Sequence, residues 1–242
     1  MNYPAVLPHD PPKQLAEDLF VVHGCVKPNA VVRFTRNMTV VRDQGQLTLI
    51  NPVRMDEAGL EALEELGEVA HVLRLGPMHG MDDPFYVDRY NADFWAFEGG
   101  ATYTTPTIKH TLSEDAALPF SKAKLFAFDH VKETEGVILL ERSPGILLTC
   151  DAIQSYATFP HMPHTNWLSR RMLPLLGFNK TTLIGPMWMK FAVTDREGVK
   201  AEFERFLKLD FDQLISAHGT FVPENAHAQF EQAFANMFGE NA

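Results

Sequence analysis

The order of apolar runs along the chain is the feature that most constrains its fold. Four short runs rich in β-branched and aromatic residues open the chain, at 19–22, 30–34, 38–41 and 47–50. Turn-forming residues at 42–46 predict a hairpin between the last two runs. Asp56 then provides a helix N-cap, Gly67 ends that helix, and residues 71–75 predict a further strand. We therefore expect a sheet of sequential strands joined to a strand-helix-strand crossover.

A second group of elements follows in the other half of the chain. The predicted strands lie at 125–128, 136–140, 145–149 and 214–216. Thr194–Glu197 has the pattern of a capping box that begins a helix, and Pro223 is expected at the first position of the last helix. Residues 151–186 show weak periodicity, so we expect irregular structure with one short helix there. No long linker interrupts residues 1–242, which predicts a single mixed α/β domain.

Composition and charge narrow the function classes. The 242 residues are 45% hydrophobic and 21% charged, an ordinary globular balance. A net charge of −10 argues against nucleic acid as a partner, and we expect a small-molecule substrate instead, with the oligomeric state left open. Cys25 and Cys150 are too few for a disulfide scaffold, which predicts buried thiols in a reducing cytoplasm. The sequence has no secretory signal and no apolar run of the ~18 residues that a membrane span needs, so no membrane association is expected.

Residues of metal-ligating types follow three of the predicted strands. Each lies shortly after an apolar run: His79 with Asp83, then Asp151, then His218. Because sites in open α/β sheets form outside the carboxyl ends of strands, we expect these three loops to converge. Imidazole and carboxylate are the ligands that zinc, iron and manganese take when the ion keeps an open position for water.

Together these motifs resemble those of the metallo-β-lactamase-fold superfamily of metal-dependent hydrolases. The matching pieces are His-Gly-Met-Asp-Asp at 79–83, Thr-Cys-Asp at 149–151 and Ser-Ala-His-Gly at 216–219, after an opening hairpin and helix. The resemblance covers nearly the whole chain and implies an α/β (α+β) fold, a four-layer αββα sandwich with metal at one edge. The family motif His-x-His-x-Asp-His is reduced here, because Met81 and Pro84 stand where its second and third histidines should be. The family's middle histidine has no match either.

The resemblance implies one divalent ion, zinc foremost, with iron or manganese as alternatives. The ligands it carries over are His79, Asp83, Asp151 and His218. His161 and His164 lie on the chain shortly after Asp151 and are candidate replacement ligands. The expected activity is hydrolysis by a metal-bound water, with Asp83 as a ligand or water-orienting group. His164 or His161 would move a proton to the leaving group.

Alternative interpretations remain open. The losses at Met81 and Pro84 favour a degenerate, metal-free member of the fold that acts as a binding or interaction protein. An iron-dependent oxidoreductase would use the same ligands. Asp82 or Asp83 before Pro84 also fits a helix N-cap with proline in the first position, which is a structural role. Met187 and Trp188 either wall an apolar substrate pocket or belong to the core.

Overall fold

The computed structural model describes residues 3–99, 106–156, 162–178 and 182–239. Its larger sheet contains seven strands in sequence order: β1 (Lys13–Ala16), β2 (Leu19–Val26), β3 (Phe34–Asp43), β4 (Gln46–Ile50), β5 (Glu68–Leu73), β6 (Asp93–Ala96) and β7 (His110–Thr111). The predicted hairpin is confirmed, because Asp43 at the end of β3 pairs with Gln46 at the start of β4. Gln44 and Gly45 between them both have positive φ, as in the two-residue turns that match strand twist.

The first crossover also forms as predicted. Helix α1 (Glu57–Glu64) begins at Asp56, whose carboxylate accepts the backbone N–H of Gly59 at 2.9 Å. Strand β5 then pairs parallel with β4. A short 3-10 helix, η1 (Pro77–Asp82), and helix α2 (Asp83–Tyr90) lead on to β6, which is again parallel. The carboxyl end of β5 therefore runs directly into η1.

The smaller sheet has the strand order β13–β10–β9–β8. Its strands are β8 (Ala123–Phe128), β9 (Glu135–Leu140), β10 (Ile146–Thr149) and β13 (Gln213–Ser216). Strands β8, β9 and β10 are antiparallel neighbours, whereas β13 pairs parallel with β10. A separate antiparallel pair joins β11 (Ile153–Ser155) to β12 (Thr182–Ile184). The parallel pairing places the loops after β10 and β13 at the same edge.

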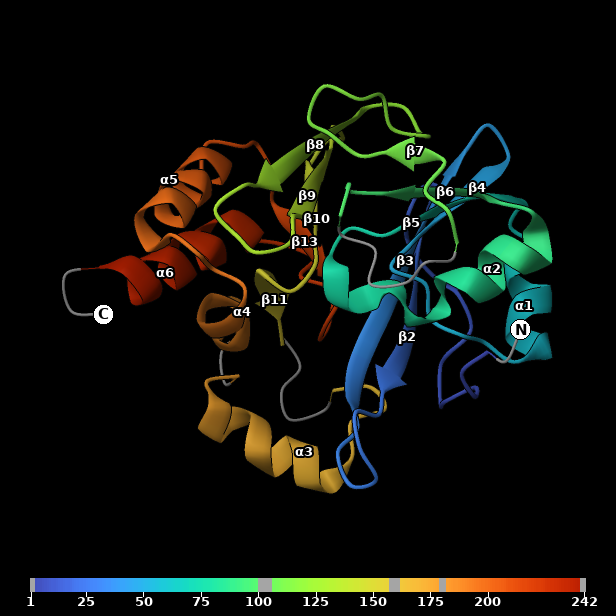
Figure 1. Cartoon of the computed structure of the whole chain (residues 1–242), viewed down its shortest axis with the longest axis horizontal. Coiled ribbons are helices and arrows are strands. Elements are labelled where there is room, and N and C mark those ends of the chain that lie inside the picture. The colour runs from blue at the N-terminus through green and yellow to red at the C-terminus, as the bar shows by residue number, and fades with distance from the viewer. Residues whose placement is uncertain (1–2, 100–105, 157–161, 179–181, 240–242) are drawn as a thin grey trace.

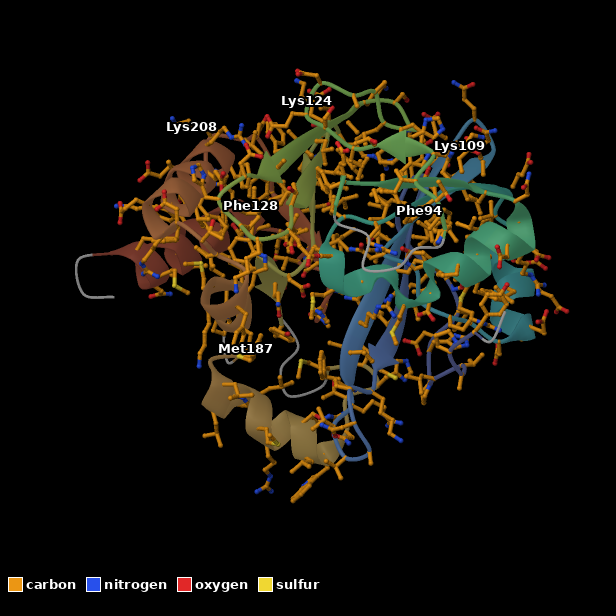
Figure 2. All side chains as sticks on the ribbon, viewed as in Figure 1. Phe94, Lys109, Lys124, Phe128, Met187 and Lys208 are labelled. Carbon is orange, nitrogen blue, oxygen red and sulfur yellow. The ribbon has the colours of Figure 1, made fainter. Side chains whose placement is uncertain are left out.

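Three apolar clusters hold four layers together (Figure 1). The first lies between the sheets and joins side chains of β2–β5 to side chains of β8–β10 and β13. The second packs α1 and α2 on the larger sheet, and the third packs α5 (Arg196–Phe206) and α6 (Ala226–Phe238) on the smaller one. Figure 2 shows Phe94 in the second cluster and Phe128 in the third. The expected αββα sandwich is confirmed.

The predicted strand at 30–34 is wrong. β3 begins only at Phe34, and the residues before it form a turn. Asn29 Oδ1 accepts the backbone N–H groups of Val31 and Val32 at 3.0 and 2.9 Å. This local side-chain bonding satisfies the backbone without a sheet partner and overrides the β-branched composition.

The region 151–186 has more regular structure than predicted. Besides β11 and β12 it contains α3 (Trp167–Met172) and the short 3-10 helix η2 (Leu173–Leu176), and α4 (Pro186–Phe191) starts at its end. The last helix, α6, begins at Ala226 rather than at Pro223. The elements of the 151–186 region, with α4 at its end, are each six residues or shorter, so tertiary contacts rather than local periodicity define them.

Two predictions about the chain as a whole can be compared with the structure. Cys25 and Cys150 are buried free thiols, as predicted. Cys25 Sγ donates to the carbonyl oxygen of Pro8 at 3.3 Å. Within the described ranges, no helix has both the length and the apolar character needed to cross a membrane.

The loop after β8 carries a histidine whose protonation is linked to folding. His130 Nδ1 lies 2.8 Å from Glu202 Oε1 of α5, and this hydrogen bond raises the pKa of His130 above its ordinary value. The folded state therefore holds this proton more tightly than the unfolded state. The resulting stabilisation is complete below the unfolded-state pKa of about 6.5 and is lost as the pH rises through the folded-state pKa.

We expect Glu202→Gln to lower the pKa of His130, because the amide keeps an acceptor oxygen but removes the charge. The variant's unfolding free energy should then depend less on pH above neutrality. NMR titration of the His130 imidazole and urea unfolding at several pH values check both effects. An imidazole that titrates identically in parent and variant would contradict the assignment.

Candidate metal centre

Loops that follow strands of both sheets bring three side chains into one cluster. Strand β10 ends at Thr149 and β13 ends at Ser216, and these two residues are paired in parallel register. Asp151 and His218 therefore emerge side by side from neighbouring strands. η1, which follows β5 of the larger sheet, brings His79 to the same place.

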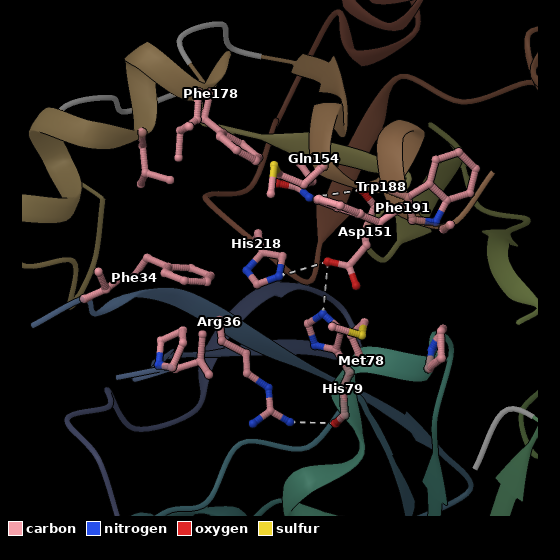
Figure 3. Close-up of a pocket in the computed structure, with 18 of the residues that line it drawn as sticks. Phe34, Arg36, Met78, His79, Asp151, Gln154, Phe178, Trp188, Phe191 and His218 are labelled. Carbon is pink, nitrogen blue, oxygen red and sulfur yellow. Dashed lines mark hydrogen bonds and ion pairs between the residues drawn. The ribbon is translucent and has the colours of Figure 1, made fainter. Parts of the chain in front are cut away.

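Asp151 lies between two histidines (Figure 3). Its Oδ1 is 3.3 Å from His79 Nε2 and 3.0 Å from His218 Nε2. The two imidazole rings are tilted, with centroids 4.9 Å apart. All three side chains line a cavity of about 640 Å³. His79 is 2% exposed and Asp151 16% exposed, so the carboxylate is the more accessible of the pair.

A backbone carbonyl fixes the tautomer of His218. Its Nδ1 lies 2.7 Å from the carbonyl oxygen of Thr35. Because a carbonyl only accepts, Nδ1 carries a proton and donates it. In a neutral ring Nε2 is then an acceptor, yet it faces another acceptor, Asp151 Oδ1, at 3.0 Å. A positive charge between them, from a proton or a metal ion, resolves this conflict, and metal-ligating histidines typically donate their second N–H in this way.

Two more atoms of the cluster have no partner among the described residues. They are His79 Nδ1 and Asp151 Oδ2, both buried. Leaving a buried polar atom unsatisfied costs about 1–3 kcal/mol, so native structures rarely tolerate two in one cluster without a bound group. Nitrogen and carboxylate oxygen are both ligands for a divalent transition metal. The residues present therefore fit a metal ion.

Burial and the imidazoles act in opposite directions on Asp151. Burial alone would raise the pKa of Asp151, but the interactions with His79 and His218 outweigh it and hold the pKa well below its usual range. Burial lowers the pKa of His79, and Asp151 only partly opposes this. An ionised carboxylate next to a histidine that resists protonation is the state in which both side chains ligate metal.

Cys150 and Glu135 complete the surroundings of the cluster. The ligand atoms of His79, Cys150 and Asp151 all lie within 4.8 Å of one another, but Cys150 is not among the residues that line the cavity. Glu135 does line it. Burial, reinforced by the charge of Asp151, raises the pKa of Glu135 well above its ordinary value. Glu135 Oε1 accepts the backbone N–H of Ala152 at 2.6 Å, while Oε2 has no hydrogen-bond partner in the described chain.

Arg36 of β3 holds the main chain of η1 in place. Its guanidinium donates to the carboxylate of Asp82 at 2.8 Å and to the carbonyl oxygens of Pro52 and His79, both at 2.7 Å. All of these contacts are buried. Arg36 stands between the polar residues Thr35 and Asn37 in β3, so the sequence does not distinguish it from a solvent-facing arginine.

Comparisons with known proteins identify the fold. Neither a family model nor a curated protein matches the sequence. Among solved structures, DIM-1 metallo-β-lactamase exposed to ceftazidime is 13% identical, with a TM-score of 0.64 over 97% of this chain and 100% of that one. A metallo-β-lactamase from Erythrobacter litoralis is 12% identical, with a TM-score of 0.60 over 93% of this chain and 92% of that one.

The chain has the metallo-β-lactamase fold. A variant of the flavo di-iron protein from Thermotoga maritima shares this fold, with 13% identity and a TM-score of 0.67. That match covers 95% of this chain but 62% of the flavo di-iron chain, so this chain spans less than two thirds of that protein. In the present metallo-β-lactamase fold the cluster of His79, Asp151 and His218 lies where the two sheets meet.

Two other predicted site residues, Asp83 and His164, do not lie in this cluster. Asp83 accepts a hydrogen bond from Arg74 Nε at 2.6 Å, and both side chains are fully buried outside the cavity lining. His164 Nε2 lies 3.0 Å from Asp10 Oδ1, also outside the lining. His161 lies outside the described residues. The physical reason for the position of Asp83 is the buried guanidinium of Arg74, which needs a carboxylate partner.

The glycine after His218 is required by two separate constraints. Gly219 has φ +87°, and a Cβ there would lie 1.5 Å from the carbonyl oxygen of Ser155. We expect Gly219→Ala to lower the unfolding free energy by about 3 kcal/mol or more, because it adds a backbone clash to the positive-φ penalty of about 1–2 kcal/mol. Urea unfolding measures this effect.

Gly45→Ala is the matched control for this prediction. Gly45 has φ +82° but nothing within 4 Å of its Cβ position. Only the φ penalty of about 1–2 kcal/mol applies there. Equal losses in the two variants would show that the close approach to Ser155 is relaxed at little cost.

Proposed function

We propose that this protein is a metal-dependent hydrolase with a single ion held by His79, Asp151 and His218. The observation that carries the proposal is the orientation of His218. Its proton on Nδ1 is committed to the Thr35 carbonyl at 2.7 Å, so Nε2 offers its lone pair to the cluster. The ionised Asp151 beside it supplies the negative charge that a divalent cation needs.

The donor set of two imidazoles and one carboxylate suits zinc first, and iron or manganese as alternatives. When bound, such an ion supplies an activated water and polarises a carbonyl group. The chain's own residues orient the ligands: Thr35 fixes the ring of His218, and Arg36 fixes the main chain of His79. All three residues that would hold the ion line the cavity, and a site with three protein ligands would keep room for water or substrate.

Glu135 is a suitable proton donor for the leaving group. Ester hydrolysis adds a water oxygen to the carbonyl carbon, breaks the carbon–oxygen bond and leaves one proton to be placed on the departing oxygen. Glu135 lines the cavity, and burial raises its pKa, which favours the protonated carboxyl that a proton donor needs. His164, the donor expected from the sequence, is paired with Asp10 instead.

Metal analysis of the purified protein tests the proposal. Inductively coupled plasma mass spectrometry, on protein purified without a metal affinity step, should find about one equivalent of zinc, iron or manganese per chain. We expect His218→Ala to lose this metal and Cys150→Ser to retain it, because His218 lines the cavity and Cys150 does not. Loss in Cys150→Ser with retention in His218→Ala would move the ion to the group of His79, Cys150 and Asp151.

A folded parent protein that contains no metal and takes up none would overturn the hydrolase proposal. The remaining candidate would then be a metal-free binding protein. The missing ligands at Met81 and Pro84 favour that candidate. Binding to the cavity would still be measurable, since its walls do not depend on a metal ion.

A further inference from the structure

Most of the described residues that line the cavity above the cluster are apolar. Its side walls do contain polar side chains, but these are occupied within the protein. Tyr156 Oη donates to Gln154 Oε1 at 2.7 Å, and Gln154 Nε2 donates to the carbonyl oxygen of Asp151 at 3.0 Å. Ser169 Oγ accepts the backbone N–H of Arg33 at 3.1 Å. Each of these groups therefore spends part of its hydrogen-bonding capacity within the protein.

Among the charged residues of the lining, Arg36, Lys132 and Glu133 are partly offset within the protein. Arg36 is 2% exposed, and its terminal nitrogens bond Asp82 and two backbone carbonyls. Lys132 and Glu133 are exposed neighbours of opposite sign, so they create no field of one sign. A polyanionic or sugar-like ligand would therefore lose more hydrogen bonds to water than these few wall groups can replace.

The remaining wall is apolar on both sides of the cluster. Figure 3 shows Phe34 and Phe178 on one side of His218 and Asp151, and Trp188 with Phe191 on the other. The rim is apolar as well. Of the nine large apolar side chains exposed in the described part of the chain, five line this cavity: Met78, Met172, Leu176, Met187 and Phe191. Such a concentration of exposed apolar surface is typical of a ligand-binding groove.

We propose that the cavity binds an amphipathic ester with one carbonyl head at the His79–Asp151–His218 floor and an apolar acyl chain along the walls. The placement of the ester carbonyl depends on the proposed hydrolase function. The placement of the acyl chain is argued from the cavity walls alone. A cavity of about 640 Å³ is within the range that encloses most of a small ligand's surface. The substrate class is therefore set by burial of hydrocarbon, with a single polar group for orientation.

Binding of n-alkanols tests the proposed acyl-chain site without any catalytic step. n-Butanol, n-hexanol and n-octanol are titrated by isothermal calorimetry into protein stripped of metal with a chelator. We expect the affinity to rise by about fourfold for each added methylene, the factor that corresponds to about 0.8 kcal/mol of transfer free energy. The heat capacity change should also become more negative with chain length.

Two neighbouring leucines provide a matched pair of variants. Leu176 lines the cavity and is 48% exposed, whereas Leu175 is 87% exposed and is not among the lining residues. Because both side chains are exposed, aspartate at either position should leave the fold intact. We expect Leu176→Asp to weaken n-octanol binding by about tenfold or more and Leu175→Asp to change it by less than about twofold.

The outcomes separate this inference from the proposed hydrolase. An affinity that does not depend on alkanol length, or equal losses in the two leucine variants, would overturn the apolar-chain assignment even if the protein hydrolyses short esters. Length-dependent binding by a protein that takes up no metal would support the apolar site and rule out the hydrolase proposal. Length-dependent binding together with faster hydrolysis of p-nitrophenyl octanoate than of p-nitrophenyl acetate would support both.

Discussion

Asp151→Asn is expected to abolish metal uptake and to slow ester hydrolysis about a thousandfold, the loss that corresponds to several kcal/mol of transition-state stabilisation. The substitution keeps the shape of the side chain and removes the charge that both histidines contact, at 3.3 and 3.0 Å. A neutral amide is a poor metal ligand in place of a carboxylate. It also leaves the Nε2 atoms of His79 and His218 without a counter-charge.

Two measurements on the same preparations check this expectation: metal content per chain, and kcat/KM for an active ester substrate. Asp115→Asn is the matched control, because it is an exposed Asp-to-Asn change at a residue outside the cavity lining. Circular dichroism and urea unfolding establish that both variants are folded. Full metal content and parental kcat/KM in Asp151→Asn would refute the assignment of Asp151 as a ligand.

The meeting of Asp151 and His218 is the part of the site that sequence reasoning handles best. Strongly apolar runs end at Thr149 and Ser216, and parallel neighbours in a sheet must end at the same edge. Ligand-type residues directly after such strands are therefore brought together by topology alone. His79 follows the same rule from the other sheet.

The partners of Glu135 and Arg36 were beyond sequence reasoning, because nothing local specifies them. Arg36 bonds Asp82 across a separation of 46 residues, and Glu135 bonds the backbone of Ala152 across 17. The sequence also could not decide whether Met187 and Trp188 line a pocket or belong to the core. Their local sequence is the same in either case, although Met187 is exposed and Trp188 is buried. Only the packing of α4 against the rest of the fold decides this.

Asp83 shows how one position of a local motif can fit two different roles. Its position in the reduced histidine motif predicts a ligand, while the structure gives it a buried ion pair with Arg74. The signal for the alternative was Arg74 itself, an arginine between two apolar residues at the end of a predicted strand. A buried guanidinium needs a carboxylate close by, and Asp83 lies nine residues later, at the start of α2.

This position leads to the second large expected effect, in which stability and metal binding separate. Asp83→Asn should lower the unfolding free energy by about 3–5 kcal/mol, because it removes the carboxylate of a fully buried ion pair that Arg74 Nε contacts at 2.6 Å. Burial raises the pKa of Asp83 to about 6 in spite of Arg74, so unfolding should be measured above pH 7, where the carboxylate is ionised. Asp88→Asn, an exposed change in the same helix α2, should cost less than about 1 kcal/mol.

Metal content decides which role Asp83 has. If the Arg74 ion pair is its function, folded Asp83→Asn retains about one metal equivalent per chain despite its lower stability, because His79, Asp151 and His218 are unchanged. A double-mutant cycle with Arg74→Met should then recover part of the lost stability, since the double variant buries no unpaired charge. Asp83→Asn that unfolds like the parent but contains no metal would instead make Asp83 a ligand, as the sequence motif predicts.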